Sequence, residues 1–81
     1  MNVLYSLRFQ KQYDDAPPNV QKAFDKQVKL LLENVRHPSL QAKKYGEAND
    51  IWQARVTRAW RFYFTIEGDT YHLHTMIPHP K

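Results

Sequence analysis

The side chains best suited to chemistry lie in the last third of the sequence, where arginines and histidines recur at short intervals. Arg55 and Arg61 are followed by His72, His74 and His79. A guanidinium group keeps its charge at any working pH, and its forked donors match the oxygens of a phosphate. An imidazole can take up or release a proton near neutral pH. These residue types in one short stretch indicate chemistry on a phosphate group.

Strands must position these residues, because apolar and polar side chains alternate along the same stretch. A period of two is typical of a strand with one buried face, and it predicts strands from Trp52 to Thr57 and from Trp60 to Ile66. Gly68-Asp69 favours a two-residue hairpin turn, after which a third strand is expected from Tyr71 to Ile77. The apolar face of the first two strands holds Trp52, Ala54, Val56, Trp60, Phe62, Phe64 and Ile66.

The hairpin turn sets the expected register between the second and third strands. A two-residue turn places Tyr63 opposite His74 and Thr65 opposite His72. The alternation puts Met76 on the polar face with the two histidines. The other face of the third strand then holds Tyr71, Leu73, Thr75 and Ile77.

The connection around Arg58 brings Arg55 and Arg61 opposite each other on the polar face. Like charges so placed destabilise a sheet by up to about 1 kcal/mol, so the pair indicates either two splayed, solvated arginines or an anion between them. Phosphate is the natural anion. Continuing the third strand carries His79 toward Arg61, and the prolines on both sides of His79 restrict the tail. A frayed terminus is the alternative.

A strand and one or two helices are expected before this sheet. Asn2 to Leu4 can form the strand, and Tyr5 to Tyr13 a short helix. A longer helix should begin beside Pro18, because the preceding acids suit a helix N-terminus, and it should run to about Arg36 before Pro38 stops it. Its apolar face holds Val20, Ala23, Phe24, Val28, Leu31, Leu32 and Val35.

The long helix is expected to cover the apolar face of the sheet, and the segment from Ser39 to Asp50 is expected to be a loop that carries Lys43 and Lys44. The predicted class is α+β, with an N-terminal strand and one or two helices packed on a three-to-four-stranded antiparallel sheet. The residues expected beneath the helix are Trp52, Phe62, Phe64 and Leu73.

Length and composition limit the kind of protein. Eighty-one residues, 42% of them hydrophobic, fit one domain over residues 1–81 with a single core. The net charge of +4 favours a polyanionic partner. The absence of cysteine excludes disulfides and fits a reducing compartment, so we expect a cytoplasmic protein. No apolar run is long enough for a secretory or membrane-spanning segment, so no membrane partner is expected.

Other kinds of site have little support. His72 and His74 could be two metal ligands on one face, but no third ligand stands at a recognisable spacing. Two glycines cannot build a glycine-rich phosphate loop, and no nucleophile elbow is present. We therefore expect neither a metal nor a small-molecule cofactor.

Four segments carry a resemblance to a known family: Lys43-Lys44-Tyr45, Ile51-Trp52-Gln53-Ala54-Arg55-Val56, Trp60-Arg61-Phe62-Tyr63-Phe64 and Pro78-His79-Pro80-Lys81. Together with the order of elements, they resemble RelE/ParE-superfamily toxins of type II toxin–antitoxin systems over nearly the whole chain. The resemblance implies a RelE/ParE-like fold and a ribosome-dependent mRNA endonuclease, or mRNA interferase, that drives a 2′-hydroxyl onto the adjacent phosphate without a metal. It also implies two partners, mRNA on the ribosome and a cognate antitoxin protein.

The resemblance also implies roles for individual residues. Arg61 matches the arginine that contacts the scissile phosphate, Arg55 matches a basic position one strand earlier, and His79 falls near the C-terminal histidine of several RNase branches. These three are the expected catalytic residues. Contacts with RNA or its phosphates are expected from Lys43, Lys44, Tyr63, His74 and Lys81.

The sequence departs from the family pattern and leaves alternatives open. The base-stacking C-terminal tyrosine of some branches is absent, so Tyr63 or Trp60 would replace it. The chain could instead resemble the non-nuclease ParE branch, which inhibits DNA gyrase, or be an inactive member that acts only as a binding module. The general base stays open among Glu47, Asp50, His74 and a lysine.

Overall fold

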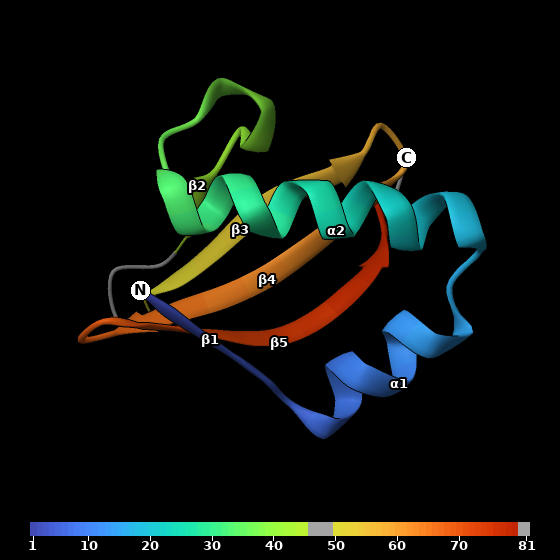
Figure 1. Ribbon diagram of the computed structural model, residues 1–81, viewed down its shortest axis with the longest axis horizontal. Coiled ribbons are helices and arrows are strands. Elements are labelled where there is room, and N and C mark those ends of the chain that lie inside the picture. The colour runs from blue at the N-terminus through green and yellow to red at the C-terminus, as the bar shows by residue number, and fades with distance from the viewer. Residues whose placement is uncertain (46–49, 80–81) are drawn as a thin grey trace.

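Five strands of the described chain form one mixed sheet, and a long helix crosses one face of it (Figure 1). The computed structural model describes residues 1–45 and 50–79. In chain order the elements are β1 (Asn2–Tyr5), α1 (Leu7–Asp15), α2 (Pro18–Glu33), the 3-10 helix η1 (Pro38–Leu40), β2 (Lys43–Tyr45), β3 (Ile51–Thr57), β4 (Trp60–Glu67) and β5 (Thr70–Pro78). The strands lie in the order β1-β5-β4-β3-β2. The predicted α+β class is confirmed.

The sheet is larger than the three-to-four-stranded antiparallel sheet that we predicted. The segment Lys43–Tyr45, which we expected in a loop, forms the edge strand β2 against β3. At the opposite edge, β1 runs parallel to β5, so the sheet is mixed. The predicted hairpin between β4 and β5 is present, and Gly68 in its turn has a φ of 59°, a conformation that glycine adopts without steric cost.

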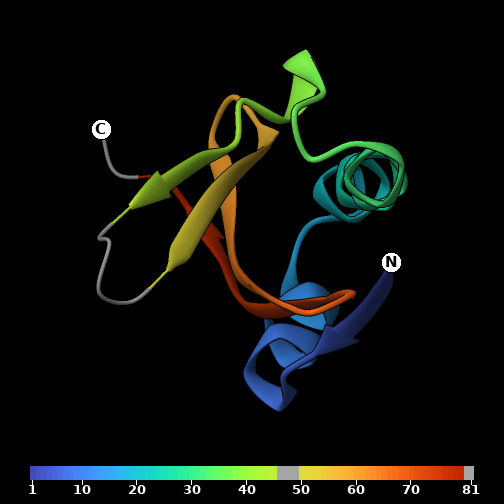
Figure 2. The same cartoon turned by 90° about the vertical axis from the view of Figure 1, so that its left-hand side faces the viewer.

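Both predicted helices form, and each begins where the sequence has a local signal. Ser6 caps α1, because its hydroxyl accepts a hydrogen bond from the Phe9 N–H. α2 begins at Pro18, where the missing N–H of proline costs nothing, and it ends at Glu33, slightly before the predicted Arg36. Figure 2 shows α2 almost end-on, on one side of the sheet. In the described chain, neither helix is long and apolar enough to cross a membrane.

The core lies between α2 and the side of the sheet that faces it. Phe62, Phe64 and Leu73 are fully buried, as predicted. Phe24 of α2 meets Phe62 edge-on, with ring centroids 5.4 Å apart. Trp52, also predicted in the core, is only half-buried because it lies toward the β2 edge, where the guanidinium carbon of Arg36 lies 5.7 Å from its ring centroid.

A β-bulge in β5 changes the register that the hairpin turn predicted. Phe64 pairs with Leu73, but the neighbouring Tyr63 pairs with Thr75. His74 is therefore an extra residue between the two pairs, and it does not lie opposite Tyr63 as we predicted.

The bulge also inverts the alternation along the rest of β5. Met76, which we expected on the polar face, is 1% exposed and lies in the core. Two side chains from the start of the chain hold the bulge. The Ser6 hydroxyl donates to the His74 carbonyl at 2.8 Å. The Gln12 side-chain oxygen accepts from the Thr75 hydroxyl at 2.7 Å and from the Met76 N–H at 2.9 Å.

Candidate nucleic-acid interface

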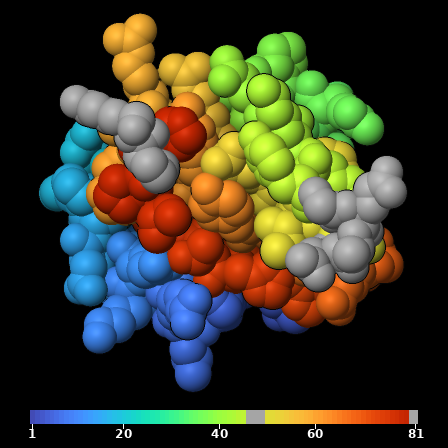
Figure 3. Space-filling view, turned by 180° about the vertical axis from the view of Figure 1, so that it is seen from behind, coloured from blue at the N-terminus to red at the C-terminus, as the bar shows by residue number. Residues whose placement is uncertain are grey.

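Arg55 on β3 and Arg61 on β4 lie directly opposite each other, as the sequence predicted. Their neighbours Ala54 and Phe62 are buried toward α2, so the two arginines belong to the other side of the sheet, which Figure 3 shows. Opposite side chains on neighbouring strands have Cβ atoms about 5 Å apart, so one anion can contact both guanidinium groups. We call this side of the sheet the basic face. Its central residues are Lys43, Gln53, Arg55, Arg61 and Tyr63.

The guanidinium group of Arg61 is fixed at the turn between β3 and β4. Its Nη1 donates to the backbone carbonyls of Thr57 at 2.6 Å, Trp60 at 2.9 Å and Arg58 at 3.3 Å. All three bonds use the same nitrogen. The N–H groups of Nε and Nη2 have no hydrogen-bond acceptor among the described residues, so they are available for an anion.

A buried glutamine of α2 supports Arg55 from the other side of the sheet. Gln27 is 6% exposed, and its Nε2 donates to the carbonyl oxygens of Arg55 at 2.7 Å and Ser39 at 3.0 Å. The register of β3 shifts between Arg55 and Thr57, and such an irregularity leaves backbone groups without a partner in the neighbouring strand. Gln27 gives the Arg55 carbonyl that partner, and so fixes β3 at the arginine pair.

His79 lies beside the turn that holds the Arg61 side chain. The His79 N–H donates to the carbonyl of Ala59 in this turn at 2.6 Å. Just upstream, Ile77 pairs with Arg61. The chain therefore brings the exposed His79 to the arginine end of the basic face. We predicted that the third strand would carry His79 toward Arg61.

The neighbouring lysines of β2 point to opposite sides of the sheet. Lys43 pairs with Gln53 and lies on the basic face. Lys44 points the other way, as alternation along a strand requires, and forms an ion pair of 3.0 Å with Asp50. Of these two expected RNA contacts, the structure places only Lys43 on the basic face with the arginine pair. Lys81 lies outside the described residues.

Three side chains form a hydrogen-bonded row across β2, β3 and β4 on the basic face. The Tyr45 hydroxyl donates to Oε1 of Gln53 at 3.2 Å, and Nε2 of Gln53 donates to the Tyr63 hydroxyl at 2.8 Å. We expected Tyr63 to contact RNA, whereas Tyr45 and Gln53 had no predicted role. A three-residue strand is too short to show alternation, so no pattern in the sequence predicts that Tyr45 lies beside Gln53.

Solved toxin structures share this arrangement of elements. The YoeB/ParE toxin from Agrobacterium tumefaciens matches with a TM-score of 0.83 over 99% of this chain and 100% of that chain, at 12% identity. The isolated E. coli RelE toxin matches with a TM-score of 0.79 over 99% and 85%, at 14% identity. The chain has the RelE/ParE toxin fold.

A toxin–antitoxin complex also contains this RelE/ParE fold. The E. coli DinJ–YafQ complex matches with a TM-score of 0.78 over 96% of this chain and 91% of that chain, at 14% identity. No protein-family profile and no curated protein sequence matches the chain. At such low identities the structural matches show the shared RelE/ParE fold alone, and the activity has to be argued from the site.

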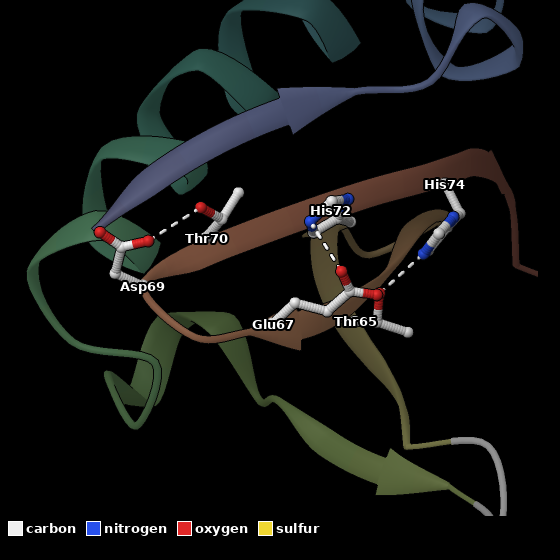
Figure 4. Close-up of polar contacts among 6 residues, drawn as sticks. All are labelled: Thr65, Glu67, Asp69, Thr70, His72 and His74. Atoms are coloured by element: carbon white, nitrogen blue, oxygen red, sulfur yellow. Dashed lines mark hydrogen bonds and ion pairs between the residues drawn. The ribbon is translucent and has the colours of Figure 1, made fainter.

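Two histidines of this RelE/ParE fold lie toward the hairpin end of the basic face (Figure 4). His72 pairs across the strands with Thr65, as predicted, and its Nε2 lies 3.3 Å from the carboxylate of Glu67. His74 is exposed, and its Nε2 lies 2.8 Å from the Thr65 hydroxyl. In residues 1–45 and 50–79, no three histidine, aspartate or glutamate side chains gather as metal ligands.

The candidates for a general base differ in where the RelE/ParE fold puts them. Asp50 is paired with Lys44, away from the basic face. Glu47 lies outside the described residues. His74 is exposed at the bulge of β5, on the side of the sheet that carries Thr65. Among Glu47, Asp50 and His74, the described structure places His74 on the basic face, toward its hairpin end. Lys43, opposite Gln53 on the same face, is a lysine candidate.

Three tyrosines that lie away from the basic face have raised pKa values. The hydrogen bond from the Tyr13 hydroxyl to the carboxylate of Asp25, 2.8 Å long, raises the pKa of Tyr13. Burial raises the pKa of Tyr5, with a smaller contribution from the charge of Asp25, and burial also raises the pKa of Tyr71. These shifts affect stability at high pH rather than chemistry at the arginine pair.

Proposed function

We propose that the chain is the toxin of a type II toxin–antitoxin system and acts as a ribosome-dependent mRNA endonuclease. The observation that carries the proposal is the Arg55–Arg61 pair on an open sheet face, in a fold that solved toxins share. Two like charges on neighbouring strands destabilise the sheet, and an anion between them relieves the repulsion. An RNA phosphate is an anion that suits a chain with a net charge of +4.

The proposed reaction is an attack within the RNA strand. The 2′-oxygen bonds to the adjacent phosphorus, the bond from phosphorus to the 5′-oxygen breaks, and a 2′,3′-cyclic phosphate and a 5′-hydroxyl result. Arg61 would stabilise the charge on the phosphoryl oxygens through its available Nε and Nη2. His79 would protonate the departing 5′-oxygen, and a base nearer the arginine pair than His74 would accept the proton of the 2′-hydroxyl. His74 lies beside Thr65, four residues along β4 from Arg61, and would contact the RNA. The permanent charge of the guanidinium groups takes the place that a metal ion has in other nucleases.

The remaining residues of the basic face would hold the substrate. Arg55 and Lys43 would bind the phosphates on either side of the cleaved bond, and Tyr63 would contact a base. Lys44 faces the other side of β2, so it would add positive charge without touching the same phosphates. We also propose Lys81 as a phosphate contact near the end of the chain.

A cognate antitoxin is the proposed protein partner. A free nuclease of this kind would stop translation in its own cell, so a second protein has to cover or distort the basic face. The DinJ–YafQ structure is a toxin–antitoxin complex whose matching chain has this fold. With mRNA on the ribosome as its substrate, the protein would act in the cytoplasm.

Induced expression in a bacterial host tests the proposed function. We expect growth arrest in which protein synthesis stops before DNA synthesis, and normal growth with Arg61→Ala. Arrest with continued translation, together with inhibition of purified DNA gyrase, would instead support the gyrase-inhibiting alternative. Normal growth with the wild-type chain at a verified expression level would support a module that only binds.

A further inference from the structure

The row Tyr45–Gln53–Tyr63 lies next to the arginine pair on the basic face. Gln53 pairs with Tyr63 just as Arg55 pairs with Arg61, so the two pairs form adjacent rungs on the same side of β3 and β4. Alternate residues of a strand are about 7 Å apart. A nucleotide whose phosphate lies at the arginines therefore places a neighbouring base within reach of the row.

We propose that these three residues form a nucleobase-reading site that favours adenine beside the cleaved bond. The inference rests on the proposed function, because it names what the same face reads in an RNA substrate. Sequence-specific recognition of single-stranded RNA needs an aromatic surface for stacking and a polar group that reads a base edge. The row provides both.

The stacking surface comes from the two tyrosines. Tyr45 is 48% exposed on the edge strand β2, and Tyr63 is half-buried on β4. The aromatic ring contacts of the described residues lie in the core and between the helices, and they involve neither tyrosine. Neither tyrosine would therefore have to give up a contact with another of these rings to stack on a base, and stacking tolerates any base.

The edge-reading group is the side-chain amide of Gln53. An amide has two N–H donors and a carbonyl oxygen that can accept two hydrogen bonds. Tyr63 uses one N–H of Gln53, and the Tyr45 hydroxyl uses one acceptor position. One N–H donor and one acceptor position of the amide remain. Adenine offers the matching pair on one edge, N7 as acceptor and the N6 amino group as donor, and glutamine pairs with it through two hydrogen bonds.

The two tyrosines also fix how the amide is presented. Because Gln53 is held from both sides, its plane is set before RNA arrives, which reduces the entropy lost on binding. Replacing Gln53 by glutamate removes the donor and leaves an acceptor, which suits the N4 amino group of cytosine. The proposal therefore predicts a change of base preference as well as a loss of rate.

The test is to map cleavage sites across a randomised mRNA in a purified translation system. Wild-type protein and the control Gln10→Ala, an exposed glutamine on α1, should cleave next to adenine at one fixed position. Gln53→Glu should lower the ratio of adenine to cytosine at that position by about tenfold or more. Tyr45→Ala should slow cleavage, whereas Tyr45→Phe, which keeps the ring, should retain most of the rate. An unchanged preference in Gln53→Glu, or no base preference in the wild type, would overturn the inference.

A binding measurement covers the case in which a variant loses activity altogether. Short RNAs with a 2′-deoxy substitution at the cleavage position cannot react, so their affinity can be measured by fluorescence anisotropy. Wild-type protein should prefer the adenine-containing RNA over a matched uridine RNA by about tenfold, and Gln53→Ala should lose that preference. Equal binding of both RNAs by the wild type would overturn the inference.

The two proposals can fail separately. If the wild type cleaves and Arg61→Ala does not, a negative result at Gln53 concerns the base-reading site alone. If the wild type cleaves no RNA, both proposals fall.

Discussion

Gln27 of α2 donates a hydrogen bond of 2.7 Å to the backbone carbonyl of Arg55, and so ties the long helix to the strand that carries one of the two paired arginines. The same amide nitrogen reaches the carbonyl of Ser39 at 3.0 Å. One buried side chain thus joins α2, η1 and β3. This contact links the packing of α2 on the sheet to the position of Arg55 on the basic face.

Replacing Gln27 by leucine should destabilise the protein by about 2 kcal/mol, because two carbonyl groups lose their buried donor. The matched control is Gln10→Leu, at an exposed glutamine with one hydrogen bond to a backbone carbonyl. Urea unfolding followed by circular dichroism measures both changes. An equal, small effect of the two substitutions would show that Gln27 does not hold β3 at Arg55.

Removing the imidazole of His79 should lower the cleavage rate by about 100-fold or more, as for other general acids. A general acid must be protonated to act, so the wild-type rate should fall as the pH rises, and His79→Ala should lose that fall. The control His72→Ala removes a histidine that contacts Glu67 at the hairpin end of β5. If His79→Ala has the rate and pH profile of the wild type, another group protonates the leaving oxygen.

Cleavage should not require a transition metal, because the guanidinium groups already supply positive charge at the phosphate. The chelator should be selective for zinc and copper over magnesium, because the ribosome needs magnesium. Adding it should leave the cleavage rate unchanged. Loss of activity that returns specifically with zinc, with the ribosomes shown intact, would revive the reading of His72 and His74 as metal ligands.

The protein should lose stability as the pH rises above about 10, where tyrosines ionise in the unfolded chain. The pKa values of Tyr5, Tyr13 and Tyr71 are raised in the fold, so the folded state keeps them neutral while the unfolded state releases their protons. The stability present below pH 10 is therefore lost as the pH rises through the folded pKa values. Tyr13→Phe should weaken this dependence in urea unfolding at pH 8 to 11; an unchanged dependence would show that the bond to Asp25 does not matter.

Much of the sheet could be predicted because its alternation is local. The apolar positions that include Phe62 and Phe64 are buried, and the short connection between β3 and β4 is sufficient to predict Arg55 opposite Arg61. The turn at Gly68-Asp69 fixes the first pairs of the hairpin in the same way. These features depend on neighbours in the sequence, which a pattern can show.

The features that the sequence did not reveal depend on distant residues. The bulge at His74 is held by Ser6 and by Gln12, which are 68 residues from His74 and 63 residues from Thr75, respectively. The strand at Lys43–Tyr45 exists because β3 gives its backbone a partner. Without these contacts, neither the burial of Met76 nor the row that starts at Tyr45 could be predicted. The part of the site that was missed is therefore the part that the edge strand builds.

The chemistry of the RNA ends in a translated mRNA distinguishes attack by the 2′-hydroxyl from hydrolysis by water. The proteins compared are the wild type, Arg61→Ala and a matched control, Arg8→Ala, at an exposed arginine of α1. The wild type and the control should produce 2′,3′-cyclic phosphate and 5′-hydroxyl ends. Arg61→Ala should be about 100-fold slower or worse while still binding ribosomes, because the lost charge acts mainly on the transition state. Cleavage by Arg61→Ala at the wild-type rate would rule out Arg61 as the group that stabilises the transition state, and 5′-phosphate ends from the wild type would rule out attack by the 2′-hydroxyl.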